Sequence, residues 1–249
     1  MDRRETGITN QTGHIRDVCR AFRNGLQSIL DDVLHGAYVF GAAAFPDTLP
    51  THDIDFHVLL TRRLIGDEKP LLEAMHRDLG DRYPPLGADM DGYYILVEDA
   101  QHREPPRSEL WANAVDDSWA LHCAHIRAGR CIVLTGPDPS GIYPEPTWNE
   151  LEATLYHELE YVQNHLKEYP DYCILNLCRL IYSFETRDVV VSKAGAAEWA
   201  MRTLPEDWHR CIDLACRSYA GDASLRDQAL MRVDLAEFFR YALLRINSD

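Results

Sequence analysis

The spacing of apolar residues predicts a long helix near the start of the chain. Between His14 and Leu34, apolar side chains recur every three or four positions, which places them on one face of a helix. These residues are Ile15, Val18, Phe22, Leu26, Ile29, Leu30 and Val33. The residues before His14 are polar, and we expect them to be loose. Gly36 is expected to end the helix, just before a strand that begins at Tyr38.

Short apolar runs of the kind that form buried strands follow the first helix. They occupy residues 38–40, 54–60, 88–97 and 131–134. The segment from Leu71 to Leu79 has helical spacing and is followed by the helix-breaking pair Pro84 and Pro85. Residues 111–127 hold scattered apolar positions that indicate a partly helical segment. Strands and helices therefore alternate in this part of the chain, which predicts a small sheet flanked by helices.

The hydrophobic pattern changes after the segment Gly136-Pro-Asp-Pro139, and we place a domain boundary nearby, between residues 143 and 144. Thr147 and Glu150 have the spacing of a capping box, which starts a run of helical periodicity. Helical segments are predicted over residues 147–167, 172–184, 192–202, 206–219 and 225–246, with Pro170 as an interruption. The pattern predicts an α+β protein in which residues 1–143 form a mixed β-sheet with flanking helices and residues 144–249 form an all-α bundle.

The charge of the chain limits the partners that it can bind. There are 25 Lys and Arg residues against 40 Asp and Glu residues, so the formal net charge is −15. Binding to nucleic acid needs a basic surface, so we expect no nucleic-acid partner. A polycationic small molecule would suit an acidic surface, although acidic side chains also serve solubility alone.

Composition also indicates where the protein works. Hydrophobic residues make up 46% of the chain, which is enough for a packed core, yet no run approaches the roughly 20 apolar residues of a membrane span. The N-terminus has no apolar segment of the signal-peptide type. The seven cysteines form no Cys-x-x-Cys pair, which favours reduced thiols over a zinc site or disulfides. We therefore expect a cytoplasmic monomer without membrane contact.

Asp53 and Asp55 stand at the entrance of the second apolar run. Residues two apart on a strand point to the same side, so their carboxylates would lie about 7 Å apart along the backbone. Two carboxylates this close repel each other unless a cation lies between them, and Mg²⁺ prefers carboxylates together with substrate phosphates. The pair therefore predicts a metal–nucleotide site at a strand end. Asp is also common in solvated turns that lead into strands, and this alternative stays open.

A wider set of residues links this pair to a known family. Gly41 followed by Asp53-Ile54-Asp55 resembles the Gly-Ser…Asp-x-Asp signature of polymerase-β-type nucleotidyltransferases. The segments 179–183 (Arg-Leu-Ile-Tyr-Ser) and Ser192–Met201 resemble the C-terminal domain of the streptomycin/spectinomycin adenylyltransferases, the aminoglycoside 3''-adenylyltransferase-like proteins. The resemblance covers residues 38–219, and it implies that the first domain is a nucleotidyltransferase domain.

The resemblance also implies a reaction. AMP would be transferred from ATP to a hydroxyl group of an aminoglycoside, with release of pyrophosphate and with Mg²⁺ as cofactor; streptomycin and spectinomycin are the first acceptors to consider. Asp53 and Asp55 would be the metal ligands. A third carboxylate is needed as the base or as a further ligand, and Asp91 stands where similar proteins carry Glu. Asp91, Asp53 and Asp55 are therefore the expected catalytic residues, with Asp89 in reserve as the base.

Contacts to the nucleotide and to the acceptor are expected partly from the same resemblance and partly from the chemistry of the two ligands. Nucleotide contacts are expected from Gly41, Ala42, His52, Arg179, Lys193 and Tyr219. Lys193 would follow a capping Ser192 at a helix N-terminus, which favours phosphate. Trp111 and Asp171 are expected to contact the acceptor. A tryptophan is often a core residue, however, and Arg179 could form a local salt bridge instead.

Three positions depart from the family pattern. Ala42 stands where the family has Ser, His52 stands where relatives often have Ser, and Asp91 replaces Glu. The missing hydroxyl at position 42 would remove a hydrogen bond to a charged group, worth roughly 1.5–3 kcal/mol. These changes keep a second hypothesis open, in which the protein is an inactive or regulatory nucleotide-binding relative that acts as an interaction module.

Overall fold

The computed structural model describes residues 3–45, 49–111 and 114–247, with side chains from residue 13 onward. The chain divides into two compact units. Met1–Pro46 and Thr51–Pro146 form the first unit, and Asp47–Pro50 and Thr147–Asp249 form the second. The chain passes into the second unit after Pro146. The division predicted from the sequence lies three residues earlier, between residues 143 and 144. No helix in these described segments is long and apolar enough to cross a membrane.

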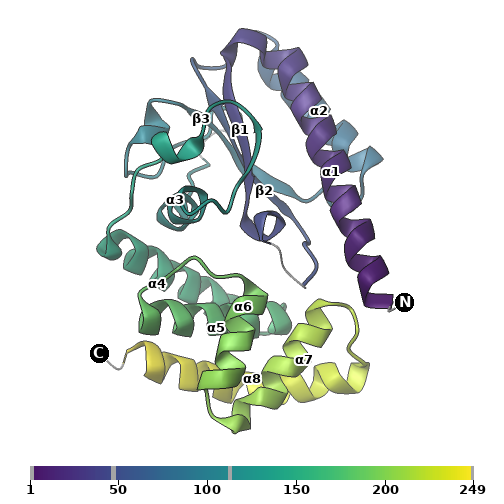
Figure 1. Ribbon diagram of the computed structural model, residues 1–249, viewed down its shortest axis with the longest axis vertical. Helices are drawn as coiled ribbons and strands as arrows, with labels where there is room; N and C mark the ends of the chain where they lie inside the picture. Colours follow the sequence, from purple (N-terminus) through teal and green to yellow (C-terminus); the bar gives the residue numbers. More distant parts are fainter. Residues whose placement is uncertain (1–2, 46–48, 112–113, 248–249) are drawn as a thin grey trace. The chain divides into compact units, whose positions relative to one another are not determined.

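A mixed four-stranded sheet forms the centre of the first unit, with the strand order β3-β2-β1-β4 (Figure 1). Its strands are β1 (Leu34–Phe40), β2 (Ile54–Leu60), β3 (Met90–Leu96) and β4 (Ile132–Thr135). β1 runs antiparallel to β2 and β4, whereas β3 runs parallel to β2. The predicted mixed sheet is confirmed, and each strand overlaps one of the four predicted apolar runs.

Gly36 lies inside β1, so the prediction that it ends the first helix is wrong. The helix ends at Leu30, and a short 3₁₀ turn over Asp31–Val33 leads directly into the strand. The aromatic ring of Tyr38 folds over Gly36, and a Cβ atom at position 36 would clash with the Tyr38 hydroxyl. Glycine at this position therefore serves a close side-chain contact within the strand rather than a helix end.

Three α-helices accompany the sheet: α1 (Arg3–Leu30), α2 (Glu68–Arg82) and α3 (Trp119–Arg127). α1 begins well before His14, so the prediction of a loose start is wrong for residues 3–13. That segment carries no apolar stripe, and periodicity therefore could not reveal the additional turns. α2 is longer than predicted at both ends, and α3 forms the helical part of the segment 111–127.

The sheet has a hydrophobic core on each face. α1 and α2 cover one face, where Val39 and Phe56 pack together with Phe22 of α1 (Figure 1). α3 covers the other face, where Phe40 packs together with Trp119. Because neighbouring strand residues point to opposite faces, the same strands supply both cores.

The second unit is entirely helical in its described part. Its α-helices are α4 (Trp148–His165), α5 (Pro170–Thr186), α6 (Lys193–Thr203), α7 (His209–Tyr219) and α8 (Leu225–Ile246). α5 is the central helix, because it packs against α4, α6, α7 and α8 and most of its residues are buried. The predicted C-terminal helical region is confirmed.

Local signals set the starts of these helices. Thr147 and Glu150 form the predicted capping box at the start of α4. Ser192 caps α6 as predicted, because its hydroxyl accepts a hydrogen bond of 2.9 Å from the backbone N–H of Gly195. As predicted, the helical pattern is interrupted between α4 and α5; Pro170 itself is the first residue of α5, because the first turn of a helix needs no N–H donor from proline.

His76 is an ionisable group of α2 that packs against the core beneath this helix. Its ring stacks on Phe56 at a centroid distance of 5.6 Å, and its Nε2 atom lies 2.8 Å from the hydroxyl of Tyr94. Burial lowers the pKa of His76 from its ordinary value to about 4. The folded protein therefore keeps this imidazole neutral at pH values where an unfolded chain would protonate it.

We expect the stability of the protein to fall in acid, because the unfolded state binds a proton at His76 that the folded state does not. The loss is absent above pH 6.5, grows as the pH falls, and is complete near pH 4. His76→Gln should remove this part of the pH dependence, whereas His157→Gln, at an exposed position on α4, should leave it unchanged. Thermal unfolding followed by circular dichroism between pH 7.5 and pH 5 measures the effect. Parallel pH profiles for the wild type and His76→Gln would contradict it.

Candidate active site

Three strands bring the predicted carboxylates to one edge of the sheet. Asp55 pairs with Phe40 across the antiparallel β1–β2 ladder and with Asp91 across the parallel β2–β3 ladder. His52 and Asp53 lie just before β2, and both side chains are exposed. The end of β1 and the starts of β2 and β3 therefore meet at the positions of the predicted metal ligands.

These carboxylates belong to the α3 face of the sheet. Leu59 of β2 and Ile95 of β3 lie in the core beneath α3, and residues at even spacing from them share that face. Asp55 and Asp91 therefore lie on the α3 side. Asp53 continues the same alternation just outside the strand. Alternate residues of β2 and β3 enter the two cores, and this alternation puts the carboxylates on one common face, as predicted.

Gly41 makes room for one of these carboxylates. Its φ angle is +62°, a left-handed backbone conformation that glycine adopts without strain. A Cβ atom at this position would clash with Oδ2 of Asp55. The carboxylate therefore lies directly against the backbone at the end of β1, where a short 3₁₀ turn over Gly41–Ala44 begins.

The pKa of Asp91 responds to its burial and to the charged groups around it. Burial raises the pKa of Asp91 above its ordinary value, and the negative charge of Asp53 raises it further, while His122 acts in the opposite direction. Burial, together with nearby carboxylates such as Asp116, raises the pKa of Tyr93 to about 12. Like charges gathered in this way favour a bound cation, and carboxylate oxygens are ligands that Mg²⁺ accepts. The residues at this edge therefore fit a magnesium site.

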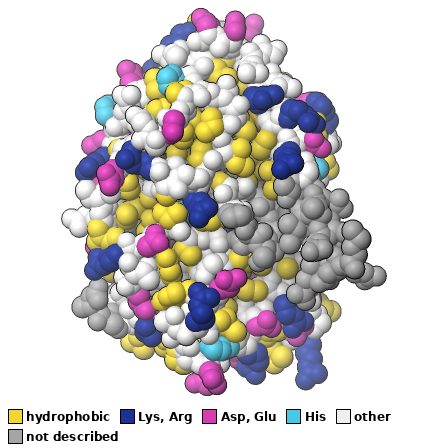
Figure 2. Space-filling model, viewed as in Figure 1, with side chains coloured by type: hydrophobic (Ala, Val, Ile, Leu, Met, Phe, Trp, Pro, Cys, Tyr) yellow, Lys and Arg dark blue, Asp and Glu magenta, His cyan; other side chains and the backbone are white. Residues whose placement is uncertain are grey.

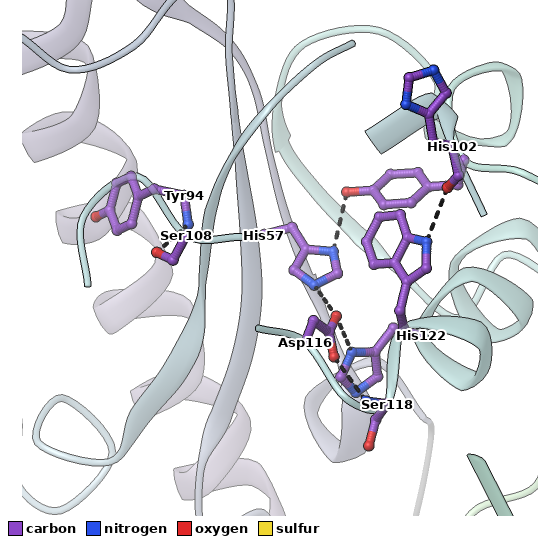
Figure 3. Close-up of polar contacts among 9 residues, drawn as sticks. His57, Tyr94, His102, Ser108, Asp116, Ser118 and His122 are labelled. Atoms are coloured by element: carbon purple, nitrogen blue, oxygen red, sulfur yellow. Dashed lines mark hydrogen bonds and ion pairs between the residues drawn. The ribbon is translucent and has the colours of Figure 1, made fainter. Parts of the chain in front are cut away.

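A triad of polar side chains, formed by buried His57 and Asp116 and partly buried His122, connects β2 to α3 and the loop before it (Figure 3). Oδ2 of Asp116 lies 3.1 Å from Nε2 of His57 and 2.8 Å from Nδ1 of His122. The other carboxylate oxygen accepts a hydrogen bond from the backbone N–H of Ser118. On its far side, Nδ1 of His57 lies 3.2 Å from the hydroxyl of Tyr143. The triad therefore connects the central strand β2 to the helix that covers it.

These contacts define the protonation of the triad. Burial alone would raise the pKa of Asp116, but the charge of His122 and the hydrogen bonds of His122 and His57 outweigh it and hold that pKa well below its ordinary range. Burial lowers the pKa of His57, so this imidazole is neutral. An ionised carboxylate only accepts hydrogen bonds, so each histidine nitrogen that faces Asp116 carries a hydrogen. Nδ1 of His57 then accepts a hydrogen bond from the hydroxyl of Tyr143.

The triad also has the composition of a transition-metal site. One ligand atom from each side chain lies within 4.8 Å of the other two, and imidazole together with carboxylate suits zinc and similar ions. In the structure, hydrogen bonds already satisfy these atoms.

The triad could not be identified from the sequence. Its members come from separate segments, and Asp116 belongs to a loop without periodicity. One signal is present, because His57 interrupts the apolar run over residues 56–60 at a position that faces a core. A histidine in a buried strand position requires a polar partner, but the sequence does not say which one.

In the second unit, two predicted nucleotide-binding residues meet. The ammonium group of Lys193 lies 5.3 Å from the ring centroid of Tyr219 and 5.1 Å from that of Tyr172. The predicted acceptor-binding residue Asp171 accepts a hydrogen bond of 2.7 Å from the hydroxyl of Ser218. The starts of α5 and α6 and the end of α7 therefore bring three of the predicted site residues together.

Arg179 and Trp111 have contacts within their own units. Arg179 donates a hydrogen bond of 3.1 Å to Asn176, while its buried Nε atom has no hydrogen-bond partner among the described residues. The ring of Trp111 packs on His76 and Tyr94 in the core beneath α2. That core lies on the sheet face opposite to the carboxylates, so the structure does not bring Trp111 to them.

Comparisons with known proteins point to one group of enzymes. Residues 148–245 match the family model for the aminoglycoside adenylyltransferase C-terminal domain. The spectinomycin 9-adenylyltransferase of Staphylococcus aureus (strain N315) is 27% identical over 143 residues, which is 57% of this chain and 51% of that protein. Its namesake from Enterococcus faecalis is 21% identical over 216 residues, or 79% of this chain and 84% of that protein. The chain thus spans about half the length of the staphylococcal relatives that it matches.

A solved structure shares the fold. The crystal structure of an enterococcal spectinomycin adenyltransferase with ATP and spectinomycin aligns with a TM-score of 0.68 and 17% identity, over 96% of this chain and 98% of that chain. The resemblance predicted from residues 179–183 and 192–201 is confirmed at the level of the C-terminal domain. Residues 148–245 are therefore similar to the aminoglycoside adenylyltransferase C-terminal domain, and the chain as a whole is similar to the spectinomycin 9-adenylyltransferases.

Proposed function

We propose that the protein is a Mg-ATP-dependent nucleotidyltransferase that moves AMP onto a hydroxyl group of an aminoglycoside-type acceptor and releases pyrophosphate. The observation that carries the proposal is the meeting of Asp53, Asp55 and Asp91 at one sheet edge, in a chain with a matching C-terminal domain. The relatives are named for spectinomycin, which makes that compound the first acceptor to test and streptomycin the second.

Asp53 and Asp55 are the proposed magnesium ligands. Their negative charge favours a cation at this edge, and a bound Mg²⁺ would polarise the triphosphate of ATP. Gly41 lets the Asp55 carboxylate lie against the backbone, so this ligand is held in place before the nucleotide binds. Asp91 supplies the third carboxylate, either as the base or as a further metal ligand.

The phosphates of ATP need donors and cations in addition to the metal. The proposed contacts are Gly41, Ala42 and His52 in the first unit and Arg179, Lys193 and Tyr219 in the second. Ala42 carries no hydroxyl, so a backbone amide would make the contact there. The buried Nε atom of Arg179 needs an acceptor, and Lys193 begins a helix whose N-terminus itself favours anions.

Asp171 is the proposed contact to the acceptor, because a carboxylate suits a cationic ligand that is rich in hydroxyl groups. The net charge of −15 supports a cationic acceptor and argues against a nucleic-acid partner. Figure 2 shows acidic and basic side chains interspersed with apolar atoms on the face in view. Trp111 is the weaker candidate, since its ring packs in the core. We expect a monomer that acts in the cytoplasm.

Ala42 and Asp91 favour a second candidate function. Each lacks part of the side chain that similar enzymes carry, which would suit an inactive or regulatory relative that binds nucleotide and acts as an interaction module.

Pyrophosphate release separates the two functions. The purified protein is incubated with Mg²⁺, labelled ATP and a panel of acceptors that includes spectinomycin and streptomycin. Release that requires one of the acceptors supports the transferase. ATP binding without release, for every acceptor, supports the interaction module.

Asp53→Asn and Asp55→Asn should each abolish Mg²⁺-dependent binding of ATP, because an amide lacks the charge that holds the metal. Isothermal titration with Mg²⁺-ATP measures the loss, and circular dichroism checks that the fold survives. Asp78→Asn is the control, since this exposed carboxylate pairs with Arg82 on α2, and it should bind as the wild type does. Unchanged affinity in both site variants would rule out the metal role.

Asp91→Asn should lower kcat by about 10²–10⁴-fold, the usual effect of losing a group that acts on the transferred proton or charge. Asp91→Glu should retain or raise activity, because similar proteins carry Glu at this position. Asp89→Asn, an exposed change just before β3, should affect kcat much less. Steady-state adenylylation of the acceptor identified by the panel measures all three. A wild-type kcat in Asp91→Asn would transfer the role to Asp89.

Lys193→Ala should reduce the rise in melting temperature that Mg²⁺-ATP produces, because a ligand stabilises the folded state according to its affinity. Lys167→Ala removes an exposed lysine of the same unit and should leave the rise unchanged. Differential scanning fluorimetry with and without Mg²⁺-ATP gives both values. A full thermal shift in Lys193→Ala would show that this residue does not hold the phosphates.

A further inference from the structure

The triad of His57, Asp116 and His122 directs three atoms that can bind a metal toward one another (Figure 3). Nε2 of His57 and Nδ1 of His122 lie 3.1 and 2.8 Å from the same oxygen of Asp116. A tetrahedral zinc ion, with its ligand atoms at about 2.0–2.1 Å, holds those atoms roughly 3.3 Å apart. Both nitrogen–oxygen distances are therefore close to those of a zinc site, and each would lengthen by only roughly 0.2–0.5 Å when an ion enters.

The kinds of ligand atom indicate which ions would bind. Two imidazoles and one carboxylate suit Zn²⁺ and similar transition metals, whereas Mg²⁺ prefers oxygen ligands alone. Zinc sites with this set of three protein ligands take a water molecule as the fourth. None of the three residues is among the proposed magnesium ligands. The triad therefore suits a different class of ion from the one that suits the carboxylate edge.

The two most buried ligands have partners that would hold them against a metal. When Nε2 of His57 binds an ion, Nδ1 carries the hydrogen and donates it to the hydroxyl of Tyr143, 3.2 Å away. Oδ1 of Asp116 accepts a hydrogen bond of 3.1 Å from the backbone N–H of Ser118, while Oδ2 faces the histidines. Partners of this kind fix the tautomer and the orientation of metal ligands. His57 and Asp116 thus have the supporting contacts that a metal site requires.

The burial of the triad favours a cation and still allows it to enter. The side chains of His57 and Asp116 are 0% and 1% exposed, so water screens the carboxylate charge only weakly. The side chain of His122 is 24% exposed, which gives the triad one side that faces solvent. An ion can arrive from that side, and the water that completes its coordination can come from there too.

Metal binding would replace the hydrogen bonds between Asp116 and the two histidines. Both rings bind an ion as neutral imidazoles, with the hydrogen on the nitrogen that faces away from it. In His57 the hydrogen moves from Nε2 to Nδ1. His122 keeps its hydrogen on Nε2 and releases any second proton to solvent. The nitrogen lone pairs and the carboxylate oxygen then bind the ion, and no group is oxidised or reduced.

We propose that His57, Asp116 and His122 form a binding site for Zn²⁺ or a similar transition-metal ion, with water as the fourth ligand. The bound ion joins β2 to α3 and to the loop before this helix, so its role is to stabilise the first unit. The inference does not rest on the proposed function, because it needs neither ATP nor an acceptor.

Co²⁺ is the probe for this site, because it replaces zinc and absorbs visible light strongly in tetrahedral sites and weakly in octahedral ones. The full-length protein is freed of metal with a chelator and titrated with Co²⁺ in an excess of Mg²⁺, which keeps the proposed magnesium site filled. One equivalent of Co²⁺ should produce the strong absorption, and Zn²⁺ should abolish it. Zn²⁺ should also raise the melting temperature, by about 5–10 °C at about 100 times its Kd.

Variants identify the ligands. His122→Asn and Asp116→Asn should each lower the affinity for Co²⁺ by about 100-fold or more, because each removes a ligand atom. His125→Asn changes a buried histidine of α3 outside the triad and should bind Co²⁺ as the wild type does. Asp53→Asn should also keep the Co²⁺ absorption, since it removes only a proposed magnesium ligand. Circular dichroism checks the fold of each variant.

Anomalous diffraction at the zinc edge, from crystals of the wild type grown with Zn²⁺, locates the ion even if a variant fails to fold. A peak among the three side chains, together with loss of the absorption in folded His122→Asn, supports the site. The inference is overturned if the wild type gives no tetrahedral absorption, if folded His122→Asn keeps it, or if a thiolate charge-transfer band shows cysteine ligands. Pyrophosphate release with an acceptor in a protein that binds no Co²⁺ would refute this inference and leave the proposed function intact.

Discussion

The register of the β1–β2–β3 ladder holds the candidate site together. Phe40, Asp55 and Asp91 occupy paired positions across it, so the backbone hydrogen bonds of the sheet determine where each carboxylate lies. A slip of one residue would turn Asp55 into the core beneath α1 and α2 and would bring Phe56 to the α3 side. Both cores oppose such a slip, because each would lose large buried side chains. Burial of apolar surface on two faces therefore fixes the positions of the charges at the edge.

The core beneath α3 tolerates an ionised carboxylate because its hydrogen bonds are complete. A buried charge without partners is strongly destabilising, and Asp116 is almost fully buried. His57, His122 and the backbone of Ser118 supply the donors. Neutral His57 in turn accepts a hydrogen bond from Tyr143, which follows β4 in the chain. The bonds that satisfy one charge thus also join β2, α3 and the end of the first unit around the carboxylate edge.

The spacing of apolar residues predicts those helices and strands that form through interactions between residues close in sequence. Periods of two and of 3.6 residues indicate the strands and most of the helices, and alternation predicts the common face of Asp53 and Asp55. Gly36 could not be recognised as a strand residue from the sequence. Glycine is needed there because the ring of Tyr38 lies against it in the folded strand. The triad depends on His57 and Asp116, which lie 59 positions apart and meet only when α3 packs on the sheet. Tertiary contacts of this kind leave no period in the sequence.

The contact between Gly41 and Asp55 limits the order in which this sequence can evolve. The volume that a side chain at position 41 would occupy is filled by the carboxylate at position 55. A larger residue at position 41 would displace the Asp55 carboxylate, whereas a smaller residue at position 55 requires no change at position 41. The clash therefore opposes a change at position 41 as long as the carboxylate stays where it is, but it does not oppose a change at position 55. A lineage that keeps the carboxylate in this position keeps the glycine, and one that loses the carboxylate removes the clash but keeps the φ angle of +62° that favours glycine at position 41.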